Sequence, residues 1–149
     1  MTRINSAISV CCLTDEHLLA EHREIKRLPF CFVKAKNSGS LNKIPEKFCL
    51  GKGHVLFFLD KPVFTLWRYK EIYKECISRG FKVENYSLNW KVYFSYDLLW
   101  TNYHITSQNE KELLLQRITE RIQSSSKVYF HYKGKRITKE KAIEILNLK

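Results

Sequence analysis

Acidic and basic side chains alternate along residues 16–27, a segment whose spacing suits a helix. The i, i+4, i+7, i+8, i+11 pattern places its members on one helix face: Glu16, Ala20, Arg23, Glu24 and Arg27. A carboxylate flanked by arginines is most often a surface ion-pair cluster. The same arrangement would suit a general acid/base held among phosphate-binding arginines. Periodicity leaves both interpretations open.

The N-terminus offers a candidate nucleophile. Thr2 is small enough to allow removal of Met1, and the processed chain would then carry a free α-amine on Thr2. Such an amine has a pKa of about 7.7–8.0, against about 10.4 for lysine. Roughly a tenth or more of it is neutral near pH 7 and can attack an electrophile without deep burial. Most proteins that begin Met-Thr make no use of this amine, so the feature is weak in isolation.

The charge balance favours an anionic partner. Lys and Arg number 26 against 15 Asp and Glu, which gives a net charge of +11 over 149 residues. The excess is spread along the chain, which predicts a basic folded surface and not a basic tail. Nucleic acid is the simplest partner for such a surface, and a merely soluble cationic protein is an equally good interpretation of charge alone.

Cysteine and histidine usage gives no sign of a metal site. The five cysteines include no CxxC pair, and no apolar signal segment follows Arg3, so we expect reduced and mostly buried thiols. The HExxH motif is absent, and His17 and His22 fall on different faces of a helix. We expect no metal.

The sequence predicts a mainly α, single compact domain with three main helices and little sheet. Thr14 caps a helix over 14–35 that Pro29 bends or interrupts, and a second helix runs over 62–79. The capping box from Ser107 to Glu110 opens a third over 107–123. Residues 129–137 form an aromatic, basic tail with a turn at Lys133-Gly134, and Thr138 caps a last short helix.

No apolar run approaches the length that spans a bilayer, so we expect no membrane partner. We expect one domain over residues 1–149, with 138–149 as a C-terminal extension. The localisation we expect is intracellular, either cytoplasmic, associated with the nucleoid, or in a virus-infected host cell. We also expect a monomer.

Five sequence blocks, in order, resemble the phage pyrimidine-dimer DNA glycosylases, also called endonuclease V. The first two are the opening Met1–Asn5 and the helix Asp15–Glu24. The others are Gly51-x-Gly53-His54-Val55-x-Phe57-Phe58-x-Asp60-Lys61, then Glu75-Cys76-x-x-Arg79-Gly80-Phe81, and last Arg117–Ile122 with Tyr129–Lys135. The resemblance covers about residues 1–137 and is weak across 85–106.

The resemblance implies a DNA repair enzyme with two activities. In the family, the N-terminal amine attacks the anomeric carbon at the 5′ base of a cyclobutane pyrimidine dimer. A Schiff base replaces the glycosidic bond, and β-elimination cuts the strand on the 3′ side. By resemblance, Thr2 is the nucleophile and Glu24 the acid/base. The resemblance also implies the DNA contacts: Arg3, Arg23, Arg27, Arg117 and Arg121.

The chain departs from the family pattern at several places. Glu16 stands where the family usually has Gln, and His22 replaces an aromatic residue, usually Tyr. Two alternatives remain open on the sequence. One is an abasic-site (AP) lyase that has lost dimer recognition, and the other is a non-catalytic protein that binds damaged DNA. We expect the partner to be double-stranded DNA that contains pyrimidine dimers or abasic sites.

Overall fold

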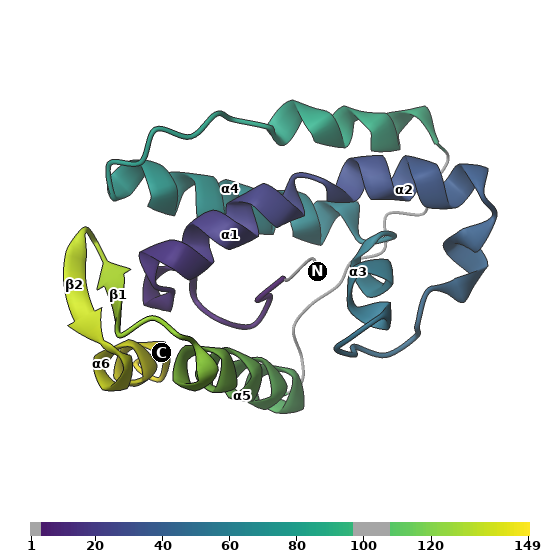
Figure 1. Cartoon of the computed structure of the whole chain (residues 1–149). Coiled ribbons are helices and arrows are strands. Elements are labelled where there is room, and N and C mark those ends of the chain that lie inside the picture. The colour runs from purple at the N-terminus through teal and green to yellow at the C-terminus, as the bar shows by residue number, and fades with distance from the viewer. Residues whose placement is uncertain (1–3, 97–107) are drawn as a thin grey trace.

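The computed structural model describes residues 4–96 and 108–149, and most of these residues lie in helices (Figure 1). Six α-helices and one hairpin are described, whereas the sequence predicts three main helices and a last short one. The elements in chain order are η1 (Val10–Cys12), α1 (Asp15–Ile25), α2 (Leu28–Asn37), η2 (Ser40–Lys43), α3 (Gly53–Phe58), α4 (Pro62–Ser78), η3 (Ser87–Ser95), α5 (Gln108–Ser124), β1 (Tyr129–Tyr132), β2 (Lys135–Thr138) and α6 (Lys139–Leu146).

The predicted helix over 14–35 is two helices in the structure. Its start is confirmed, because Thr14 Oγ1 accepts a hydrogen bond from the His17 backbone N–H at 3.3 Å. The helix then ends at Ile25, and α2 begins at Leu28. A proline ring clashes with the carbonyl four residues earlier, and that residue is Ile25 for Pro29. The break therefore falls before the proline, and Pro29 lies in the first turn of α2.

The second and third predicted helices agree closely with the structure. Helix α4 spans Pro62–Ser78 with Pro62 in its first turn, and Gly80 follows with a positive φ of 82°. Helix α5 begins at Gln108, within the predicted third helix, and Ser107 of the predicted capping box lies outside the described residues. The short helix α3 arises within a segment that the sequence marks only as buried.

A hydrophobic core holds α1 against α4. Leu18 and Ile25 of α1 are fully buried, as are Tyr69 and Ile72 of α4. Figure 1 shows α1 crossing α4, with α5 and α6 on the other side of α1. Helix α1 is thus a central element with one face toward the core and another toward α5.

The predicted aromatic tail folds as an antiparallel β-hairpin, and its predicted turn is confirmed. Lys133 and Gly134 both have positive φ, 51° and 77°, as a tight turn between twisted strands requires. Their backbone N–H groups donate to the Asp15 carboxylate at 3.0 and 2.9 Å. Arg79, after the end of α4, donates to the same carboxylate at 2.8 Å. Asp15 thereby joins the hairpin, α1 and the end of α4.

The C-terminal extension, residues 138–149, forms helix α6 and packs against this hairpin. Thr138 Oγ1 accepts a hydrogen bond from Lys141 N at 3.2 Å, which confirms the predicted cap of the last helix. Ala142, Ile145 and Leu146 are buried, and α6 packs on α5 and on both strands. The extension therefore packs beside α5 (Figure 1).

Candidate active site

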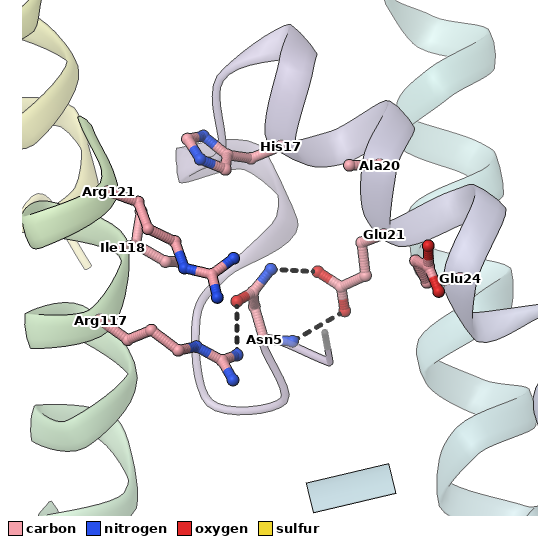
Figure 2. A pocket seen from close by; sticks show the side chains of 8 residues that line it. All are labelled: Asn5, His17, Ala20, Glu21, Glu24, Arg117, Ile118 and Arg121. Carbon is pink, nitrogen blue, oxygen red and sulfur yellow. Dashed lines mark hydrogen bonds between the residues drawn. The ribbon is translucent and has the colours of Figure 1, made fainter. Parts of the chain in front are cut away.

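A pocket of about 210 Å³ lies between α1 and α5. The described part of the N-terminal segment, from Ile4 onward, passes between these two helices (Figure 2). The lining residues come from these three segments: Asn5, His17, Ala20, Glu21, Glu24, Arg117, Ile118 and Arg121. The pocket thus places two carboxylates of α1 opposite two guanidinium groups of α5.

Glu21 anchors the N-terminal segment on α1. Its carboxylate accepts hydrogen bonds from Asn5 N at 3.1 Å and from Asn5 Nδ2 at 2.9 Å. Arg68 of α4 donates Nε and Nη2 to the same carboxylate at 2.9 and 3.1 Å, and its Nη1 to Ile8 O at 2.7 Å. Asn5, Glu21 and Arg68 are all buried. A buried charge pair of this kind holds its place only when its other polar atoms are also satisfied, as they are here.

Two arginines of α5 approach this segment from the opposite side. Arg117 Nη2 donates to Asn5 Oδ1 at 3.2 Å and lies 3.4 Å from Ile4 O. Arg121 points from α5 into the pocket (Figure 2). Its buried Nη1 has no hydrogen-bond partner among the described residues. A buried guanidinium nitrogen without a partner is costly unless an anion pairs with it, so the pocket is suited to a phosphate or carboxylate group.

Glu24 lies at the edge of the pocket, one turn beyond Glu21. Its side chain is 26% exposed, and Oε2 has no hydrogen-bond partner among the described residues. Arg27 Nη1 lies 3.7 Å from that oxygen, and the Arg27 side chain is 65% exposed. The carboxylate therefore lines the pocket with one buried oxygen that makes no hydrogen bond among the described residues, and a carboxylate in this position can act as a general base.

Glu16 does not join the pocket, although the helical spacing predicts that it shares a face with Glu24. Its carboxylate accepts hydrogen bonds from the His131 backbone N–H and ring, the latter at 2.9 Å, and Lys127 lies 3.8 Å away. Burial would raise the pKa of Glu16, but the His131 hydrogen bonds and the Lys127 charge together lower it. Glu16 therefore pairs with His131 of the hairpin and with Lys127 just before it.

His22 occupies an aromatic environment on another face of α1. Its ring lies 5.5 Å from that of Tyr69 and 6.0 Å from that of Tyr86, and its Nε2 is 3.2 Å from the Tyr69 hydroxyl. Burial lowers the pKa of His22, and the Lys26 charge adds to this. A neutral imidazole packed on two tyrosines fills the space that an aromatic side chain would take.

The structure brings some of the predicted site residues together and leaves others apart. Glu24, Arg117 and Arg121 line the pocket. Arg23 is exposed and is not among the lining residues. Arg27 does not line the pocket either, and its Nη1 lies 3.7 Å from Glu24 Oε2. Thr2 and Arg3 lie outside the described residues.

The sequence reasoning missed three lining residues: Asn5, His17 and Glu21. The i, i+4, i+7 spacing of His17, Glu21 and Glu24 is the signal that places them on one face of α1. His17 also stacks on Phe130 of the hairpin, with ring centroids 5.9 Å apart. Asn5 carries no local signal, because its role arises from a contact with a helix 16 residues away.

The thiols differ in part from expectation. Cys12 and Cys76 are buried, but Cys11, Cys31 and Cys49 are only half-buried, and all five are free. Burial raises the pKa of the Cys76 thiol to about 11. Across residues 4–96 and 108–149, no three His, Cys, Asp or Glu side chains gather in a way that could hold a metal ion. No helix of these ranges is long and apolar enough to cross a membrane.

Comparison with known protein families identifies the family of this chain. Residues 1–88 match the family described as pyrimidine dimer DNA glycosylase. The match covers more than half of the 149 residues and includes Asn5, Glu21, Glu24 and Arg68. Helix α5, the hairpin and α6 lie beyond it. The chain therefore belongs to the pyrimidine dimer DNA glycosylases, a family of DNA repair enzymes.

Proposed function

We propose that the protein cleaves the glycosidic bond of the 5′ base of a cyclobutane pyrimidine dimer in double-stranded DNA and then cuts the strand as an AP lyase. The α-amine of Thr2 is the nucleophile, and Glu24 is the acid/base. Neither step needs a metal or an organic cofactor, because the amine and the carboxylate supply the nucleophile and the proton acceptor.

The first step exchanges the base for the amine. The Thr2 nitrogen attacks the anomeric carbon C1′, and the bond from C1′ to the base breaks with its electron pair going to the base. The base takes up a proton that the amine gives up. A proton delivered to the ring oxygen O4′ then opens the sugar, and the product is a protonated Schiff base between Thr2 and C1′.

The second step cuts the strand. The positive charge of the Schiff base weakens the C2′–H bond, and Glu24 accepts that proton. The electron pair forms a C2′–C3′ double bond, and the C3′–oxygen bond breaks with its electrons going to the departing 3′ phosphate. Hydrolysis of the Schiff base releases the amine of Thr2 for another turnover.

One observation carries the proposal. Glu24 and Arg121 line the same pocket, and Asn5 lies between the two side chains (Figure 2). The buried Oε2 of Glu24 and the buried Nη1 of Arg121 make no hydrogen bond among the described residues. The chain leads from Asn5 and Ile4 to Thr2 within two residues, and two Cα–Cα steps span at most about 8 Å. A nucleophile on Thr2, a proton acceptor and a phosphate-binding arginine can therefore serve one sugar-phosphate group.

Affinity for DNA is expected to depend on salt through the arginines of this pocket. If Arg121 pairs with a phosphate, Arg121→Gln should reduce the slope of log affinity against log salt by about one unit. Replacement by glutamine of each other predicted phosphate contact should reduce the slope by a similar amount. These contacts are Arg3, Arg23, Arg27 and Arg117. Fluorescence anisotropy titrations at several salt concentrations measure the slope.

Lys74→Gln is the matched control, because it also removes one positive charge. Lys74 is exposed on α4, pairs with Glu71 at 3.6 Å and does not line the pocket. For Lys74→Gln, the slope of log affinity against log salt should stay near that of the wild-type protein. Equal slopes for Arg121→Gln and Lys74→Gln would show that Arg121 does not neutralise a phosphate.

Borohydride trapping on two duplexes tests the proposed activity. Borohydride reduces a Schiff base to a stable amine and so joins the protein covalently to the DNA. We expect an adduct on a duplex with a pyrimidine dimer and on a duplex with an abasic site. An adduct on the abasic duplex alone would indicate a lyase without dimer recognition. The absence of both would indicate a protein that only binds DNA.

A further inference from the structure

The block Gly51–Lys61 contributes no residue to the pocket, yet it reaches the N-terminal segment through His54. His54 lies in the first turn of α3, and its Nε2 is 3.1 Å from the backbone N of Ile4. Its Nδ1 is 3.0 Å from Cys49 O. Both His54 and Ile4 are almost fully buried. The ring therefore links the main chain at Ile4 to the main chain at Cys49, 45 residues further along the chain.

The contacts decide which ring nitrogen carries the proton. With the proton on Nδ1, the ring donates to Cys49 O and accepts the Ile4 N–H on Nε2. Nε2 also lies 3.0 Å from Ile4 O, but that carbonyl has Arg117 Nη2 as a second neighbour at 3.4 Å. A proton on Nε2 would leave the buried Ile4 N–H without an acceptor. Burial, with the Arg117 charge, lowers the pKa of His54 to about 4 and keeps the ring neutral.

The surroundings of His54 hold the ring in this orientation. Phe48 and Phe58 each meet it edge-on, at centroid distances of 5.6 and 5.3 Å. A Cβ on Gly53 would lie only 2.7 Å from Cys49 Sγ, so glycine at this position lets the loop close against the start of α3. The close loop places Cys49 O next to Nδ1. The block thus forms a fixed support for one neutral histidine tautomer.

We propose that His54 is a positioning residue that fixes the direction in which the main chain leaves Ile4 toward the Thr2 amine. This inference rests on the proposed function of that amine. Three elements hold the segment: His54 of α3 at Ile4 N, Glu21 of α1 at Asn5 N, and Arg117 of α5 at Asn5 Oδ1. Of the three, the contact of His54 lies nearest to Thr2 in sequence. His54 itself does not touch the DNA sugar.

Two substitutions at His54 separate its two hydrogen bonds. Asparagine places an amide near the position of Nδ1, where it can donate to Cys49 O but cannot reach Ile4. Glutamine is one methylene longer and can present its oxygen to the Ile4 N–H. His54→Asn should therefore lose the positioning contact, and His54→Gln should restore much of it. Trp90→Phe controls for lost stability, because it removes the buried hydrogen bond from Trp90 Nε1 to Thr65 Oγ1, which lies outside the pocket.

Three measurements on the full-length protein report on the inference. The first is the single-turnover rate of borohydride trapping on an abasic duplex. The second is affinity for a duplex with a tetrahydrofuran abasic analogue, which cannot form a Schiff base. The third is hydrogen exchange of the Ile4 amide in the free protein. We expect His54→Asn to slow trapping about tenfold to a hundredfold, as a misplaced nucleophile does, and to speed exchange at Ile4. Affinity for the analogue should stay near wild type.

The outcomes separate this inference from the function on which it rests. Trapping by His54→Asn at the wild-type rate, or equal slowing by Trp90→Phe, would overturn the positioning role. A loss of affinity for the analogue that matches the loss of rate would also overturn it, because the defect would then lie in DNA binding. If the wild-type protein forms no adduct, the proposed function fails first and the role of His54 fails with it.

Discussion

Protein that retains Met1, or carries an acetyl group on the Thr2 amine, is expected to form no borohydride-trapped adduct with dimer-containing or abasic DNA. Acetylation converts the amine to an amide, whose nitrogen is not nucleophilic. Retention of Met1 leaves a free amine but moves it by one residue, or about 3.8 Å. A shift of this size removes the nucleophile from a site in which reacting atoms must lie about 3–3.5 Å apart. Trapping followed by denaturing gel electrophoresis measures the loss.

Substitutions at Thr2 supply the controls. Thr2→Ser keeps the primary amine and should retain activity, because the side chain takes no part in the chemistry. Thr2→Pro leaves a constrained secondary amine and should lose much of it. All forms should bind the tetrahydrofuran analogue with similar affinity. Full trapping by the acetylated protein would contradict the role of the amine.

Glu24→Gln is expected to slow both base release and strand cleavage while DNA binding survives. The substitution keeps the shape of the side chain and removes its ability to accept a proton. General acid/base catalysis is typically worth about 10²–10⁴-fold, so we expect a rate loss of that order or larger. Single-turnover cleavage of dimer-containing and abasic duplexes measures each step.

Glu16→Gln is a matched control on the same helix. Glu16 pairs with His131 and does not line the pocket, so its neutralisation should leave the cleavage rate near that of the wild-type protein. Equal losses in Glu16→Gln and Glu24→Gln would indicate a general effect of charge on α1. Near-normal turnover in Glu24→Gln would reduce that carboxylate to an ion-pair partner of Arg27.

The features of the fold that the sequence predicts well are set by interactions between residues close together in the chain. Thr14 and Thr138 cap helices, and Lys133-Gly134 forms a turn, because a side chain or a left-handed backbone acts within a few residues. The sequence also predicts that Pro29 bends or interrupts the helix over 14–35, and in the structure the interruption falls at residues 26–27. Pro29 excludes a helix through the carbonyl of Ile25, so the break precedes the proline by several residues.

The site was predictable only in part. Helical spacing groups Glu16 with Glu24, but the hairpin that draws Glu16 away is 115 residues further along the chain. The anchors of the N-terminal segment are also distant in sequence, since Glu21 pairs with Arg68 across 47 residues and His54 meets Ile4 across 50. Such contacts arise only once α1, α3 and α4 have packed. The family resemblance supplied Glu24 and Arg121, which periodicity alone left open.

Peptide mapping of the trapped adduct tests the central claim most directly. The wild-type protein is reduced with borohydride on an abasic duplex and digested with a protease and a nuclease. Mass spectrometry then identifies the residue that carries the sugar remnant. We predict that the remnant lies on the α-amine of Thr2, in the N-terminal peptide without Met1. A remnant on a lysine side chain, such as that of Lys26 just after the helix that carries Glu24, would contradict the N-terminal mechanism.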